Sequence, residues 1–348
     1  MIGSILLGAG FLIDSLALSI ESLPLLIIGV GVIGGIGLGL GYVTPVVTAA
    51  KWFTDKKGFV TGMVVMGFGF GALIMSKLIT PIIMNITDNN MVTAFLYIGI
   101  VLLVLGFPAS IFITPPPADY VPAGYTPSAP KTNVQGVAKL DLTVKDSITS
   151  GKFIMMWIMF FINITAGIML IGFQSPMMQD IMGKHNPALD AAALASAGAT
   201  LIAITSIFNG VGRFFWGGIS DKIGRVQTFR LILGVQIIVF VLLLFVGNPW
   251  IFGALFCIVL LCYGGGFGTM HSFVGDIFGA KLMPVVYGII LTAWSTAGIV
   301  GPQIAAIMKD KFPDTASTYS FIAAAGLLAV GLLIAFFLNN KTLEGKEA

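Results

Sequence analysis

Long apolar stretches follow one another through almost the whole chain of 348 residues, and they constrain its fold more than any other feature. Of these residues 57% are hydrophobic and only 9% are charged, whereas a soluble protein carries about 25% charged residues. A helix needs about 20 apolar residues to cross a bilayer. We therefore expect an all-α membrane protein with ten spans in the lipid bilayer, at 2–20, 24–50, 59–84, 92–114, 153–178, 191–216, 228–246, 250–275, 285–308 and 318–338.

One long polar segment, at 115–152, interrupts this series of spans. It opens with three consecutive prolines and continues with further prolines, lysines and aspartates, a composition typical of a linker. The sequence thus predicts an incomplete N-terminal helical bundle of four spans at 1–114, the linker at 115–152, a C-terminal six-helix bundle at 153–338 and a tail at 339–348.

The basic residues predict which way the chain lies in the membrane. Thirteen of the eighteen fall in the linker, the tail and three loops that alternate with them, and the opposite loops hold three: Lys184, Lys309 and Lys311. Lysine and arginine are enriched in cytoplasmic loops. We expect the linker and the C-terminus to face the cytoplasm.

Several function classes are disfavoured by composition. A net charge of +3 gives no basic footprint for nucleic acid. Two histidines and two cysteines, the latter five residues apart in one apolar stretch, provide neither a metal site nor a catalytic cluster. A channel is disfavoured as well, because the sequence shows no repeated polar residues that could form a ring around a pore. We expect a protein that is not an enzyme, holds no cofactor or metal, and is a monomer.

A weak internal repeat relates residues 37–62 to residues 264–288, at an offset of about 226 to 227 positions. Extending this alignment places Phe68 opposite Trp294. Two-half repeats of this kind are typical of transporters. Counting back through the repeat, the first half should contain six spans, and its first two are absent here.

Charge is concentrated unusually in the stretch from Asn209 to Arg225. Arg213 lies within an apolar span, and a charge inside a membrane span is a functional-site hypothesis by default. Asn209 precedes it by four residues and so shares its helix face. Alternatively, Arg213 extends to the lipid headgroups or pairs within the following loop. We expect that loop to be a tight turn in which Gly224 supplies the backbone freedom.

These residues resemble a known family. The pattern Gly217-x-Ile219-Ser220-Asp221-Lys222-x-Gly224-Arg225 is similar to the second-half loop motif of the major facilitator superfamily. Five further stretches resemble the oxalate/formate antiporter (OFA) family within it: 39–45, 51–58, 66–72, 278–279 and 287–302. The resemblance implies helices three to twelve of a fold of two six-helix bundles, working by alternating access to a central site.

The resemblance also implies a substrate site. Arg213 stands where the antiporter and the monocarboxylate carriers have a substrate-binding arginine, with Asn209 beside it. The antiporter has lysine where this chain has Trp294, which leaves one evident cation and favours a monocarboxylate over oxalate. An aromatic cavity is implied at Tyr42, Phe68, Tyr263, Phe267 and Trp294, although aromatic residues in spans often pack in the core or face lipid.

Two further roles complete the predicted site. The resemblance implies a conformational latch formed by Gly217, Asp221, Lys222, Gly224 and Arg225, in which the aspartate caps the N-terminus of a neighbouring helix. The alternative is a loop that is merely basic. His271 and Asp14 are candidates for proton coupling, and a packed, hydrogen-bonded core residue is the alternative for His271. Lys77, also in a span, is expected to extend to the membrane surface.

Taken together, these features predict a secondary active transporter of small organic anions in the plasma (inner) membrane. The substrate is expected to be a monocarboxylate such as formate, lactate or pyruvate, or oxalate, carried by antiport or proton symport. The alternative is a truncated, non-transporting membrane fragment of such a carrier.

Overall fold

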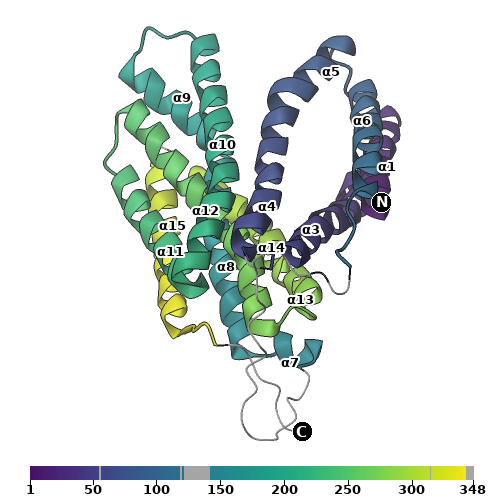
Figure 1. The fold of residues 1–348 in the computed structure, drawn as a ribbon. Helices are drawn as coiled ribbons and strands as arrows, with labels where there is room; N and C mark the ends of the chain where they lie inside the picture. The colour runs from purple at the N-terminus through teal and green to yellow at the C-terminus, as the bar shows by residue number, and fades with distance from the viewer. Residues whose placement is uncertain (55, 118–119, 121–141, 314, 342–348) are drawn as a thin grey trace, which may run out of the picture. The chain divides into compact units, whose positions relative to one another are not determined.

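The computed structural model describes residues 1–54, 56–117, 120, 142–313 and 315–341, and every regular element in these ranges is a helix (Figure 1). The first eight elements are α1 (Ile2–Ser19), α2 (Leu23–Leu26), η1 (Ile27–Gly34), α3 (Gly35–Trp52), α4 (Lys57–Ile74), η2 (Met75–Ile79), α5 (Thr80–Ile86) and α6 (Met91–Ile111). The others are α7 (Val144–Ile148), α8 (Gly151–Ile171), α9 (Gln174–His185), α10 (Ala191–Ile223), α11 (Arg225–Leu243), α12 (Pro249–Phe278), α13 (Met283–Ile290), α14 (Thr292–Lys311) and α15 (Ala316–Phe337).

The expectation of an all-α membrane protein is confirmed. Nine helices in the described ranges are long and apolar enough to cross a bilayer. The remaining expected span, at 59–84, corresponds to the run α4, η2 and α5, in which η2 has π-helical geometry. The span expected at 153–178 is divided, because α8 ends at Ile171 and α9 begins at Gln174.

Polar residues in the short connections cap the apolar helices. The side chains of Asn90, Ser150, Asp190 and Asn248 each accept a hydrogen bond from a backbone N–H in the first turn of the helix that follows. The first turn of a helix has N–H groups without helical partners, and such caps satisfy them. The connections therefore help to set where these four helices begin.

The prediction of a turn from Asp221 to Arg225 after the span at 191–216 is wrong, because the actual break is a single residue. Helix α10 continues to Ile223, so Asp221 and Lys222 lie in its last helical turn, and α11 begins directly at Arg225. Gly224 is the single residue between the two helices, and its φ is +88°. Because glycine adopts positive φ without steric cost, one residue suffices for the break and no longer turn is needed.

The contacts divide the chain into two units. The first comprises Met1–Asp55 and Gly71–Thr126, and the second Lys56–Phe70 and Pro127–Ala348. The start of α4 therefore groups with the C-terminal helices. The domain boundaries given above remain a prediction.

In the first unit, α1 packs against η1, α3 and α6. Glycines allow this packing. A Cβ atom added to Gly3 would lie 2.9 Å from the carbonyl oxygen of Gly37, and one added to Gly10 would lie 2.8 Å from that of Gly29. Membrane helices characteristically associate through small residues that let their backbones approach.

In the second unit, the most extensive helix pair is α10 with α12. The backbones of these two helices are in contact. A Cβ atom added to Gly264 would lie 2.0 Å from the carbonyl oxygen of Asn209, and one added to Gly268 would lie 2.0 Å from that of Arg213. Both distances are too short for any side chain. The glycines of α12 therefore determine how closely it packs against α10 near Arg213.

This contact predicts the effect of a larger residue. Gly268→Val should destabilise the protein by about 1–3 kcal/mol, the usual cost of overpacking a well-packed interior. The thermal unfolding midpoint of the purified chain in detergent measures the effect. Gly326→Val is the control, because a Cβ atom there has no neighbour within 4 Å. Equal midpoints for the two variants would contradict the role given to the α10–α12 contact.

Candidate functional site

Arg213 is a buried cation in the second unit, with 2% of its surface exposed. It lies in the last third of α10, where α12 approaches the α10 backbone closely. One Nη donates to the backbone carbonyl of Val65 in α4, at 3.1 Å. Nε lies 3.5 Å from Oδ1 of Asn209, one helical turn earlier. The guanidinium is therefore held between α4 and its own helix.

Aromatic rings surround this guanidinium. Its central carbon lies 4.8 Å from the ring centroid of Phe267 and 5.2 Å from that of Phe68. Trp294 contacts both phenylalanines edge-on, at centroid distances of 5.3 and 5.9 Å. Tyr263 packs against Phe267 at 5.5 Å. Four of the five aromatic residues expected in the cavity thus form one cluster with Arg213.

The cluster provides positive charge without a matching negative charge. Among the residues that the structure describes, no carboxylate lies within 4 Å of the Arg213 guanidinium, whereas Arg225 has two such partners. A guanidinium has five N–H donors, and only two hydrogen bonds engage those of Arg213. Phe68 is 37% exposed, so the cluster is open at this ring. The arrangement can bind an anion through the remaining donors.

Tyr42 and Asp14 lie in the first unit. Tyr42 is buried in α3, and its place in the cavity remains a prediction. Asp14 is buried in α1 and accepts a hydrogen bond from the backbone N–H of Val30, at 3.0 Å. Val30 belongs to the π-helical η1, so the carboxylate has a structural contact there. Its role in proton coupling also remains a prediction.

His271 lies one helical turn after Phe267 in α12 and is fully buried. Its Nε2 is 3.5 Å from the hydroxyl oxygen of Ser272, and its ring packs edge-on against Tyr287. Nδ1 has no hydrogen-bond partner among the described residues. The imidazole therefore retains one free nitrogen on the helix that supplies two of the aromatic residues.

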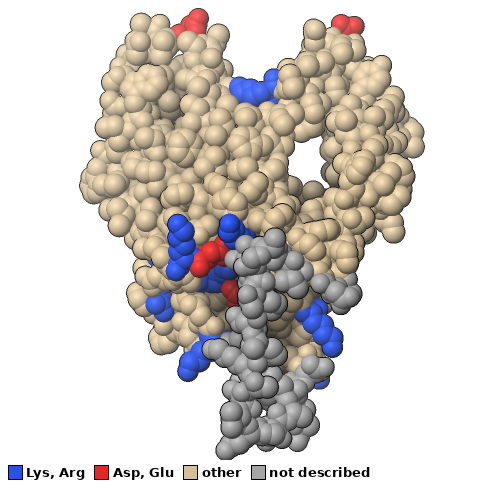
Figure 2. Space-filling view, in the orientation of Figure 1, with Lys and Arg blue, Asp and Glu red and all other residues tan. Residues whose placement is uncertain are grey.

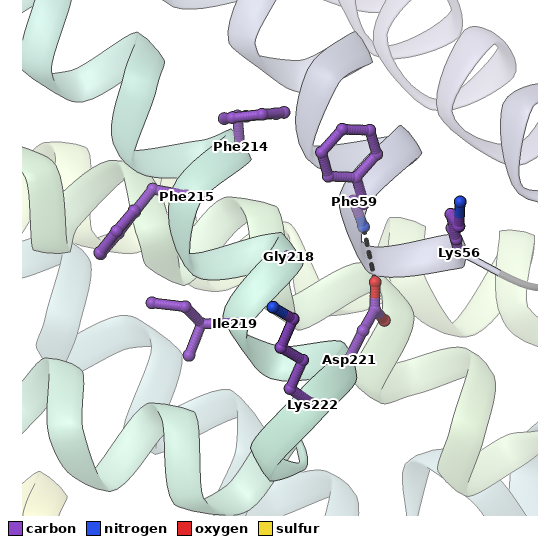
Figure 3. Close-up of a pocket in the computed structure, with 8 residues that line it drawn as sticks. All are labelled: Lys56, Phe59, Phe214, Phe215, Gly218, Ile219, Asp221 and Lys222. Carbon is purple, nitrogen blue, oxygen red and sulfur yellow. Dashed lines mark hydrogen bonds between the residues drawn. The ribbon is translucent and has the colours of Figure 1, made fainter.

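The end of α10 forms a second site with the start of α4. Both carboxylate oxygens of Asp221 accept backbone hydrogen bonds, one from Gly58 at 3.1 Å and one from Phe59 at 2.9 Å. Figure 3 shows this side chain directed at the first turn of α4. The N-terminus of a helix carries a partial positive charge and unpaired N–H groups. Asp221 therefore caps α4 from a different helix.

Arg225, the first residue of α11, ties this cap to α12. Its Nη1 lies 2.7 Å from Oδ1 of Asp221 and also contacts the hydroxyl of Ser220, while Nε lies 2.9 Å from Oδ2 of Asp276 in α12. Gly217 allows the approach, because a Cβ atom there would lie 2.5 Å from the carbonyl oxygen of Gly58. Four of the five residues expected in the latch lie in or beside this network: Gly217, Asp221, Gly224 and Arg225. The fifth, Lys222, is exposed.

Three participants were not foreseen from the sequence. The carbonyl of Val65 has no sequence signature, because every residue has one. Phe160 packs against Phe267 at 5.2 Å, but nothing distinguishes it among 27 phenylalanines. Asp276 could have been found, since it is an acidic residue at the end of an apolar span, two residues before the Phe278–Gly279 pair. Within the described ranges, no group of three His, Cys, Asp or Glu side chains is placed to hold a metal.

Comparison with known proteins shows which families and relatives the chain resembles. The model of the Major Facilitator Superfamily matches residues 1–302. The oxalate:formate antiporter of Oxalobacter formigenes is 27% identical over 80% of this chain and 62% of its own length. The apicoplast pyruvate carrier 1 of Toxoplasma gondii is 27% identical over 78% of this chain and 57% of its own length. The chain thus spans about three fifths of these relatives.

A solved structure shows the same fold. The fucose:proton symporter FucP of Escherichia coli aligns with 96% of this chain and 82% of its own chain, at a TM-score of 0.67 and 14% identity. The helical architecture, the spanning helices and the family match agree with one another. The chain belongs to the Major Facilitator Superfamily, a family of membrane transporters.

Proposed function

We propose that the chain is a secondary transporter of small organic anions, and that Arg213 binds the substrate carboxylate. The observation that supports this most is the buried guanidinium with no carboxylate within ion-pair distance in the described part of the chain. Taking a charge out of water is unfavourable unless it is paired. A charge kept in this position is best explained by a partner of opposite charge that comes and goes.

The surroundings favour a small planar anion. A guanidinium forms two parallel hydrogen bonds with a carboxylate, and the rings of Phe68, Phe267 and Trp294 form flat walls around it. Apolar walls with a few placed polar groups are typical of small-molecule sites. The relatives named for oxalate, formate and pyruvate carry substrates of this chemistry. Membership of the oxalate/formate antiporter family is part of the proposal.

Counting charges favours a monocarboxylate. Arg213 is the cation of the aromatic cluster, and Trp294 occupies the position where the resemblance leads one to expect a second. A single cation balances formate, lactate or pyruvate but leaves one charge of oxalate unbalanced. We infer that the substrate carries one carboxylate.

Alternating access requires a contact that breaks as the site opens. We infer that the Asp221 cap of α4 is that contact. It joins α10, which carries Arg213, to α4, whose Val65 carbonyl accepts a hydrogen bond from Arg213, so separating the two helices would also alter the anion site. The imidazole of His271 and the carboxylate of Asp14 are our candidates for proton coupling if the transport is symport.

The first test replaces the arginine. Arg213→Lys retains the charge but loses the planar fork, and hydrogen bonds to charged groups contribute about 1.5–3 kcal/mol. Affinity for formate, lactate or pyruvate should fall roughly tenfold to a hundredfold. Isothermal titration of the purified chain measures it, without requiring transport. Arg230→Lys is the matched control, because Arg230 contacts backbone carbonyls near the end of α15. Unchanged affinity in Arg213→Lys would remove this residue from the site.

The second test adds a cation. Trp294→Lys should raise affinity for oxalate relative to formate by about tenfold or more, since a second charged donor faces the second carboxylate. Competition between the two anions in the same titration gives the ratio. Trp250→Lys, at a residue that is 71% exposed, controls for added charge. An unchanged ratio in Trp294→Lys, or wild-type protein that already prefers oxalate, would contradict the charge count.

The third test concerns the latch. Asp221→Asn retains one oxygen acceptor but loses the ion pair with Arg225 and one of the two backbone hydrogen bonds. Hydrogen exchange at the start of α4 should accelerate by about tenfold, measured by mass spectrometry on peptides covering Gly58 and Phe59. Asp180→Asn, at an exposed residue of α9, is the control. Exchange that stays at the wild-type rate in Asp221→Asn would show that the carboxylate does not hold the two helices together.

A further inference from the structure

A groove lies beside the Asp221 cap, between the end of α10 and the start of α4. It encloses about 560 Å³. Its apolar lining consists of Phe59, Phe214, Phe215 and Ile219, and two lysines, Lys56 and Lys222, stand at its rim (Figure 3). We refer to it as the lysine-rimmed groove.

The groove is separate from the candidate anion site. Its α10 residues recur at positions 214, 215, 218, 219 and 222, and with 3.6 residues per turn these share one face of the helix. Asn209 and Arg213 lie four residues apart on the opposite face. Phe215 is 44% exposed, whereas Arg213 is 2% exposed. One face of α10 thus points into the bundle and the other points away from it.

An outward apolar face on a membrane helix meets lipid. Phe214 and Phe215 lie two turns from the end of α10, so the groove lies where the helix leaves the apolar part of the bilayer. Gly218 keeps the floor of the groove open, because it has no side chain. Even a Cβ atom at this position would lie 3.4 Å from Cδ2 of Phe59. The space suits an acyl chain near its junction with a headgroup.

The rim carries positive charge that no described residue balances through an ion pair. Neither Lys56 nor Lys222 forms an ion pair with any residue in the described ranges. The carboxylate at the rim, Asp221, is occupied by Gly58, Phe59 and Arg225. In Figure 2, lysine and arginine side chains gather at the lower end of the second unit, where α10 ends. We expect this end to face the cytoplasm.

We propose that the lysine-rimmed groove binds an acidic phospholipid, with an acyl chain against the phenylalanines and the phosphate between Lys56 and Lys222. Basic groups at the cytoplasmic side of membrane helices attract anionic headgroups. The apolar lining favours a lipid over a soluble anion, and the two lysines favour an acidic headgroup over a zwitterionic one. Because the groove and Arg213 occupy opposite faces of α10, this site does not depend on the proposed substrate.

The test counts lipids that the protein retains. The full chain is purified in detergent, exposed to mixed micelles of phosphatidylglycerol and phosphatidylcholine, and examined by native mass spectrometry. Wild-type protein should retain phosphatidylglycerol in preference to phosphatidylcholine. The double variant Lys56→Gln/Lys222→Gln should bind phosphatidylglycerol roughly tenfold or more weakly, since each lysine contributes to attraction of an anionic lipid.

Two further variants distinguish a built site from general surface charge. Lys51→Gln/Lys145→Gln removes two exposed lysines on the same expected side of the membrane and should leave retention unchanged. Gly218→Phe fills the groove, leaves both lysines in place and should reduce retention. Equal retention by wild type and Lys56→Gln/Lys222→Gln, an equal loss in the control pair, or equal retention of the two lipids by wild type would overturn the proposal.

Discussion

The backbone contact between α10 and α12 is the constraint on which the candidate site depends. Gly264 and Gly268 bring α12 against the carbonyl oxygens of Asn209 and Arg213. Because no side chain separates the two helices there, Phe267 reaches the guanidinium of Arg213 within 4.8 Å. The abundance of glycine in α12 is thus tied to the position of a charge on α10. Small residues serve packing and site geometry together.

A second constraint is electrostatic. Arg213 is buried in an apolar helix, and its described surroundings supply a carbonyl, an amide oxygen and aromatic faces. These partners are attractive to a cation, but none of them carries a full negative charge. Arg225 contrasts with it, since carboxylate oxygens of Asp221 and Asp276 both lie within 3 Å of its guanidinium. The first arginine is arranged for a ligand that is not part of the protein, and the second is arranged to hold helices together.

Much of this could be predicted from the sequence, and the rest depends on packing. The apolar stretches predicted the helices, and the motif from Gly217 to Arg225 predicted the family. The repeat offset paired Phe68 with Trp294, whose rings are in contact. The predicted end of α10 was wrong, because one glycine at positive φ takes the place of the whole expected turn. The carbonyl of Val65 could not be predicted, because its role follows only from the packing of α4 against α10.

The central claim is that the Arg213 guanidinium binds the substrate carboxylate. Solid-state NMR tests it most directly, by measuring the dipolar coupling between ¹³C-carboxylate formate or lactate and ¹⁵N-guanidinium arginine in the lipid-reconstituted chain. The chain has only three arginines, and spectra of Arg213→Lys identify the signal. A carboxylate carbon within about 4 Å of a guanidinium nitrogen, lost in that variant, is the predicted result. Bound anion without such a coupling, or a coupling that survives in Arg213→Lys, would contradict the account.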